Sequence, residues 1–280
     1  MPRPRVRLAL PVLVGALVGA SAAQDTDPKP PAPAPEPRVV EVSKELRERL
    51  KLDPFYQKHL DLAGLPVLGS ARVSDAALVE AAHLIRQMLS ERDDVLRAMV
   101  KKGCRFVVMA PTEMTTDVPE QRHLKNDPKT DWDKRARGLG GRITSCGEEN
   151  LLNLKGDRYR NENILIHEFS HAVHRYGIGS LDPKFDGRLR DTYKAATDGG
   201  LWKDTYAATN HSEYWAEGVQ SYFDCNAPPN RGVHNDVNTR EKLSKYDPRL
   251  FDLIDETFKK PAYRYVRYDK RPPPAKKAGD

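Results

Sequence analysis

Apolar and polar positions alternate along the chain with two different periods. Between residues 74 and 89 apolar side chains recur with the period of a helix, and Ser74 occupies the N-cap position. Residues 105–110 (RFVVMA) and 142–146 (RITSC) are short and rich in β-formers, which predicts two strands. Further helices are predicted at 90–102, 161–176, 183–197, 210–223, 239–245 and 248–259. This layout predicts an α+β fold that is mostly helical, with a small β-sheet before the helix at 161–176.

The segment between the two predicted strands, residues 112–141, is polar and has no period. We therefore expect a long surface excursion. Ordered segments of this length often border a binding cleft.

The N-terminus has the order of a secretory signal peptide. Three arginines precede an apolar run over residues 8–20, and small residues continue to Ala23. The run is too short for a transmembrane helix, although an uncleaved N-terminal anchor is the alternative. Cleavage after Ala22 or Ala23 fits the small-residue pattern. We expect a signal peptide at 1–23, no membrane span after its removal, and a secreted or periplasmic protein.

The rest of the chain divides into a linker, one domain and a tail. Residues 24–38 are proline-rich and predict an extended linker. We expect residues 39–268 to form one domain, the catalytic domain, and residues 269–280 to form a basic, proline-rich tail. Because residues 1–23 hold three arginines and no acid, removing them lowers the net charge from +6 to +3. The tail could contact a polyanion, but no nucleic-acid-binding motif accompanies it, so we expect no nucleic-acid partner.

Three cysteines are an odd number for an exported protein. Cys104 begins a predicted core strand, which leaves Cys146 and Cys225 as the predicted disulfide. No pair has CxxC spacing, so metal binding by cysteine is not expected.

The stretch ENILIHEFSHAVHRYG carries the chemistry. His167 and His171 are four residues apart, so a helix projects both from one face, as two zinc ligands require. Glu168 is placed to act as general base on a metal-bound water, which makes the stretch an HExxH motif. A pair of surface histidines on an ordinary amphipathic helix is the alternative. The apolar flanks argue against it, because a buried histidine pair needs a partner.

A catalytic zinc takes a third protein ligand. The extended motif with a glycine three and a histidine six residues after the second histidine is not met, because His174 and Gly177 occupy those positions. We interpret His174 as a surface or supporting histidine. The third ligand is then an acid on a later segment.

The helix at 210–223 offers two acids, Glu213 and Glu217, one turn apart on an apolar-flanked face. One could bind the metal while the other accepts the ring N–H of a ligating histidine. Asp182, in a loop signal before a proline, is the alternative third ligand.

Together, HEFSHAVH and YAATNHSEYWAE resemble the gluzincin zinc metallopeptidases with a lethal-factor-like catalytic domain. In that family an HExxH helix is followed by Y-x6-E-(F/Y)-x-A-E. The resemblance implies a zincin-like fold, Glu213 as third zinc ligand, Tyr206 lining the site and Glu217 as the supporting acid. The resemblance covers residues 161–223. Residues 39–140 have no match to the substrate-binding regions of the lethal-factor toxin.

Together with the predicted signal peptide, the resemblance implies a secreted metallopeptidase that uses Zn²⁺ and Glu168 to hydrolyse a peptide or protein substrate. Tyr206 would donate to the oxyanion, with a packing role as the alternative and His211 as an outside candidate. Glycines 138, 140 and 141 could let a substrate strand approach the sheet edge, or form a flexible turn. An exported zinc-binding or wall-associated module without turnover, and a zinc hydrolase of a non-peptide amide, remain alternatives.

Overall fold

The computed structural model describes residues 38–229 and 233–272, all of which belong to one compact unit. The predicted signal peptide, nearly all of the linker and most of the basic tail lie outside the described residues. Within them, no helix has the length and apolar character needed to cross a membrane.

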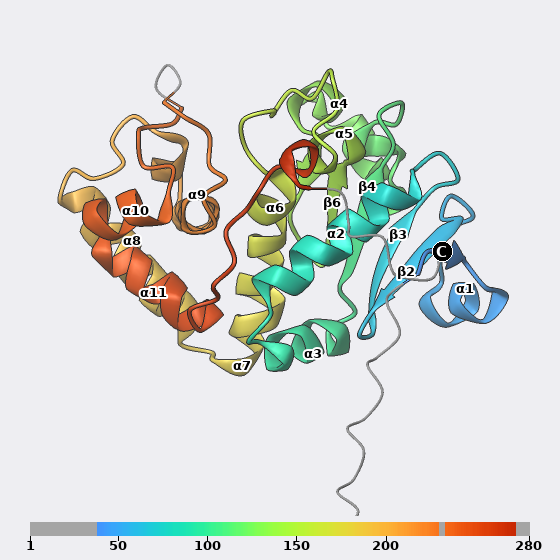
Figure 1. The fold of residues 1–280 in the computed structure, drawn as a ribbon, viewed down its shortest axis with the longest axis horizontal. Helices are drawn as coiled ribbons and strands as arrows, with labels where there is room; N and C mark the ends of the chain where they lie inside the picture. Colours follow the sequence, from blue (N-terminus) through green and yellow to red (C-terminus); the bar gives the residue numbers. More distant parts are fainter. Residues whose placement is uncertain (1–37, 230–232, 273–280) are drawn as a thin grey trace, which may run out of the picture. The chain divides into compact units, whose positions relative to one another are not determined.

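A six-stranded mixed sheet forms the N-terminal part of the fold, in the order β1-β2-β3-β4-β6-β5 (Figure 1). Pairs β3–β4 and β4–β6 are parallel, and the other three pairs are antiparallel. The predicted strands are confirmed as β4 and β6. The strands are β1 Val40–Glu41, β2 Lys58–Leu62, β3 Leu65–Gly69, β4 Arg105–Met109, β5 Gly138–Leu139 and β6 Ile143–Gly147.

Strands β2 and β3 form a hairpin that the sequence analysis did not predict. Their two-residue turn places Ala63 and Gly64 at φ 49° and 91°. Two consecutive left-handed residues match the twist of the flanking strands, as in tight hairpins. The hairpin widens the sheet beyond the two predicted strands.

Helices dominate the chain after β6, which confirms the predicted α+β class. The α-helices are α1 Lys44–Leu50, α2 Asp75–Met88, α3 Asp93–Lys101, α4 Trp132–Arg135, α5 Glu148–Leu151, α6 Ile164–Ala172, α7 Gly179–Leu181, α8 Phe185–Asp198, α9 His211–Tyr222, α10 Arg240–Tyr246 and α11 Pro248–Phe258. Helix α6 packs on β6, α2 and α9, and α9 contacts α8, α10 and α11. Figure 1 shows α6 beside the sheet and α8, α10 and α11 together near α9. Helix α6 is therefore enclosed from both sides.

The helix at 161–176 differs from its prediction at both ends. It begins at Ile164, because Asn163 caps it by accepting a hydrogen bond from the Ile166 N–H at 2.9 Å. It does not stop at Gly177, but continues through a π-helical turn, η3 (Val173–Ile178), into α7. A Cβ on Gly177 would lie 2.6 Å from Val95 Cγ1 of α3. This glycine therefore permits close helix packing and is no stop signal.

Residues 112–141 are less exposed than predicted. They contain two 3-10 helices, η1 (Thr115–Asp117) and η2 (Pro119–Asn126), and their buried polar side chains are hydrogen-bonded. Thr115 donates to the carbonyl of Ala136 at 2.6 Å, and Arg137 pairs with Glu149 at 2.6 Å. Because hydrogen bonds of polar side chains anchor the segment, it shows no apolar period.

The predicted Cys146–Cys225 disulfide is wrong: all three cysteines are buried free thiols. Cys146 Sγ lies on β6, 3.5 Å from the carbonyl oxygen of Gly147. Cys225, just after α9, donates instead to the carbonyl of Gln220 at 3.4 Å. Burial raises the pKa of Cys104 to about 12, and that of the other two well above its usual value.

Candidate metal centre

Helix α6 presents His167 and His171 on the face that packs against α9. Their ring centroids are 5.1 Å apart, and both residues are buried. One metal-binding atom from each histidine and one from the Glu168 carboxylate lie within 4.8 Å of one another. The three residues of the HExxH motif therefore converge as their spacing predicts.

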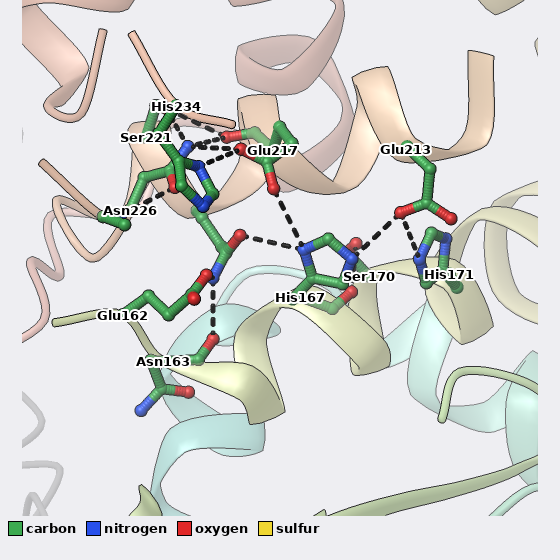
Figure 2. Close-up of polar contacts among 12 residues, drawn as sticks. Glu162, Asn163, His167, Ser170, His171, Glu213, Glu217, Ser221, Asn226 and His234 are labelled. Atoms are coloured by element: carbon green, nitrogen blue, oxygen red, sulfur yellow. Dashed lines mark hydrogen bonds and ion pairs between the residues drawn. The ribbon is translucent and has the colours of Figure 1, made fainter. Parts of the chain in front are cut away.

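Glu213 approaches the two histidines from the first turn of α9. Asn210 caps this helix by accepting hydrogen bonds from the N–H groups of Ser212 and Glu213, at 2.9 and 3.0 Å. Glu213 Oε2 lies 3.1 Å from His167 Nε2 and 3.7 Å from His171 Nε2 (Figure 2). Ligand atoms about 2.0–2.1 Å from a tetrahedral zinc are separated by about 3.3–3.4 Å. Two imidazoles and a carboxylate at these distances fit a zinc ion.

The outer nitrogens of both rings have partners. His167 Nδ1 lies 2.8 Å from Gln220 Oε1, and His171 Nδ1 lies 3.0 Å from Ser212 Oγ. A hydrogen on each Nδ1 leaves the lone pair of each Nε2 free for a metal ion. Neither Gln220 nor Ser212 was predicted from the sequence. Glu217, interpreted there as the supporting acid, lies farther from His167, with 3.7 Å between its Oε1 and Nδ1.

The electrostatics favour a positive charge between these groups. Burial lowers the pKa of His167, but Glu213, Glu168 and Glu217 raise it by more, to about 10. Burial likewise raises the pKa of Glu213, yet its contacts with His167 and His171 bring that pKa far below its usual value. The site is therefore rich in negative charge, as a cation-binding site should be.

A pocket of about 280 Å³ opens beside His167 and is bordered by residues of the 112–141 segment, as predicted. Glu168 and Tyr206 both line it. The Tyr206 ring centroid is 6.3 Å from that of His167, and its backbone N–H donates to the carbonyl of Val233 at 2.8 Å. Burial and the nearby Glu213 raise the pKa of Tyr206, so its hydroxyl stays a donor at neutral pH. The pocket thus joins a carboxylate base and a phenol donor.

The other candidates lie elsewhere. Asp182 pairs with Arg188 at 2.8 Å. His174 and His211 both contact Asp186 Oδ1, at 3.0 and 3.2 Å between Nε2 and Oδ1. None of these residues lines the pocket.

A second set of side chains that could bind a metal ion lines the same pocket. Atoms of Glu162, Glu217 and His234 lie within 4.8 Å of one another. Glu217 Oε2 accepts hydrogen bonds from His234 Nδ1 at 3.1 Å and from Asn226 Nδ2 at 3.0 Å. Burial and then Glu217 raise the pKa of Glu162. Glu162 and His234 were not predicted from the sequence, because neither belongs to a recognisable motif.

Comparison with known proteins gives a structural similarity but no family. No family model matches the chain, and no curated protein matches it. A solved structure, that of the PRO-PRO endopeptidase PPEP-2 from Paenibacillus alvei, is similar with a TM-score of 0.44 and 18% sequence identity. The similarity covers 69% of this chain and 97% of that one.

Proposed function

We propose that the chain is a zinc-dependent metallopeptidase of the gluzincin class, exported with a cleaved signal peptide at residues 1–23. One observation carries the proposal. Glu213 Oε2 lies 3.1 Å and 3.7 Å from the Nε2 atoms of His167 and His171, and Glu168 lies beside the two histidines on the wall of a pocket. The lethal-factor-like motif pattern in the sequence supports the same class.

His167, His171 and Glu213 would hold the zinc. When bound, zinc lowers the pKa of a coordinated water towards about 7 and polarises a carbonyl group. Glu168 is half-buried and faces the pocket, so its carboxylate can accept a proton from the attacking water and return it to the leaving amine. Tyr206 can donate its hydroxyl hydrogen to the oxygen that gains negative charge.

The position of β5 favours an extended peptide as substrate. Strand β5 is at the edge of the sheet, and Gly138 lines the pocket. A Cβ on Gly138 would lie 2.5 Å from Ile164 Cγ2 and 3.0 Å from Glu168 Cγ. Glycine here lets the edge strand lie directly against the helix that carries the base. A peptide that adds to this edge as a further strand would pass that base.

The first experiment measures zinc and turnover in the mature chain. Protein recovered from the secreting host should begin at residue 23 or 24 by intact mass and contain tightly bound zinc. It should cleave members of a peptide library, and a chelator should stop the cleavage. Glu168→Gln should lower the rate by about 10²–10⁴-fold and retain the zinc. Glu256→Gln, on the exposed surface of α11, is the control that should keep full activity.

Two outcomes would contradict the enzyme part of the proposal, and a third would contradict its signal peptide. Zinc binding without cleavage of any peptide would instead support an exported zinc-binding module or a hydrolase of another amide. If the protein contains no zinc after reconstitution, the assignment as a zinc metallopeptidase is wrong. An unprocessed N-terminus would contradict the signal peptide alone.

A further inference from the structure

Three side chains gather on the far side of the His167 ring from Glu213. Glu162 precedes α6, Glu217 lies in the middle of α9, and His234 lies in the loop that follows α9. Figure 2 shows them on the side of the ring opposite Glu213 and His171. They are therefore a separate group, divided from the candidate metal centre by one imidazole ring.

This group has a donor atom without a partner. The Glu217 side chain is 4% exposed, and its Oε2 is occupied by His234 and Asn226. Among the described residues no hydrogen bond reaches Glu217 Oε1, and the ring nitrogen that pairs with it, His167 Nδ1, is 3.7 Å away. This oxygen is not one of the fully enclosed polar atoms without a partner in the described residues, so it is accessible from the pocket that Glu217 lines. A carboxylate oxygen that has no hydrogen bond and faces a pocket can bind a metal ion.

The group also has an uncompensated negative charge. In the described part of the chain neither Glu162 nor Glu217 forms an ion pair with a lysine or arginine. Gln220, a neutral group, donates to Glu162 Oε2 at 3.3 Å. Once His167 binds the first metal ion as a neutral ring, even a protonated His234 would balance only one of the two carboxylates. A divalent cation would balance both.

The donors indicate the kind of cation. Two carboxylates and one imidazole suit Zn²⁺ or Mn²⁺, whereas Ca²⁺ takes six to eight oxygen ligands. All three residues line the pocket that also contains Glu168, so an ion between them could be reached by a ligand in the pocket.

We propose that Glu162, Glu217 and His234 form a second divalent-cation site, specific for Zn²⁺ or Mn²⁺, on the opposite side of the His167 ring from the candidate metal centre. The bound ion connects the loop at His234 to α9 and to the start of α6. It also places a positive charge in the pocket, where it can attract a carboxylate of the substrate. The site does not depend on the first zinc being present.

The test counts ions in the mature chain, residues 24–280, by equilibrium dialysis against buffered free Zn²⁺ with metal analysis by mass spectrometry. The unmodified protein should bind two ions, one tightly and one more weakly. Glu162→Gln and His234→Gln should lower affinity at the weaker site at least tenfold, and keep the tight ion. Glu241→Gln, an exposed acid paired with Lys245 on α10, should retain both ions. A parallel dialysis of the zinc-loaded tight site against Mn²⁺ determines which ion the weaker site prefers.

His171→Ala separates this inference from the proposed function. The variant should lose the tight ion and keep the weaker one. A single ion that is lost in His171→Ala but kept in Glu162→Gln overturns the second site and leaves the metallopeptidase intact. A single ion with the opposite behaviour supports the second site and overturns the zinc assignment at the HExxH motif. A second ion that Glu162→Gln and His234→Gln leave unchanged also overturns the inference.

Discussion

The candidate metal centre has a close counterpart in the same molecule. One turn beyond His171, His174 faces Asp186, and His211 at the start of α9 faces the same carboxylate oxygen. Each cluster thus has two imidazoles directed at one acid. By residue type and distance alone, either cluster could be interpreted as part of a metal site.

The surroundings distinguish the two clusters. Asp186 is 44% exposed and already pairs with Arg190 at 2.7 Å, whereas Glu213 is 19% exposed and has no arginine or lysine ion pair among the described residues. Of the three candidate ligands, His167 lines the pocket, whereas neither His174 nor His211 does. The ring of His174 packs against Phe185 and Trp215 instead. Residual negative charge and access to a pocket, more than the presence of histidines, identify the cation site.

The sharpest test of this comparison removes the central acid of each cluster. Glu213→Gln should weaken zinc binding by more than about 100-fold, because loss of even a supporting partner typically costs 10–100-fold. Asp186→Asn should leave the zinc affinity unchanged. Zinc titration against a chromophoric chelator measures both. Equal losses in the two variants would show that the clusters act as one unit.

Acidification should lower the stability of the protein through His174, in the cluster around Asp186. Burial lowers the pKa of His174 to about 4, although Asp186 opposes the shift. Between that pH and the unfolded value of about 6.5, the unfolded chain binds a proton that the folded chain does not. Stability is therefore lost as pH falls from about 6.5 to about 4, by up to about 3 kcal/mol.

Urea unfolding of the zinc-free protein at pH 7 and pH 4.5 measures this loss, and His174→Gln should show a smaller one. His123→Gln, at an exposed position on η2, should behave as the unmodified protein. If His174→Gln keeps the full pH dependence, the burial of this ring has no such effect.

A smaller effect is expected where the metal centre meets the sheet. A Cβ on Gly140 would lie 2.7 Å from His171 Cδ2 and 2.9 Å from the backbone oxygen of Glu168, whereas one on Gly141 would meet nothing nearer than 3.9 Å. Gly140→Ala should cost about 1–3 kcal/mol of stability and weaken zinc binding, because it displaces a ligating ring. Gly141→Ala should change neither. Thermal unfolding with and without zinc compares the two, and an unaffected Gly140→Ala would contradict the close contact.

The sequence predicted the part of the site that lies within single helices. The spacing of His167, Glu168 and His171 and the position of Glu213 in a first turn are local features, and the structure brings these four residues together. Gln220 could have been predicted from the sequence, because it follows Glu213 and Glu217 on the same helical face. The β2–β3 hairpin could also have been predicted, from the alternation of apolar and polar residues before Ala63 and Gly64.

Other features depend on contacts between distant segments. His234 meets Glu217 through a loop that carries no periodic pattern. The disulfide prediction failed because cysteine number and compartment say nothing about where the thiols lie, and burial alone accounts for all three. Gly177 was wrongly predicted to end a helix. A glycine is required there because Val95, on another helix, packs too closely for a side chain.

The three unbridged thiols make the protein suitable for a simple measure of local opening. All three cysteines are buried: Cys104 directly precedes β4, Cys146 lies on β6, and Cys225 follows α9. An alkylating reagent can therefore reach each thiol only when the structure around it opens. Labelling rates resolved by peptide mass then report separately on the sheet and on the C-terminal helices. The natural chain thus supplies its own chemical probes.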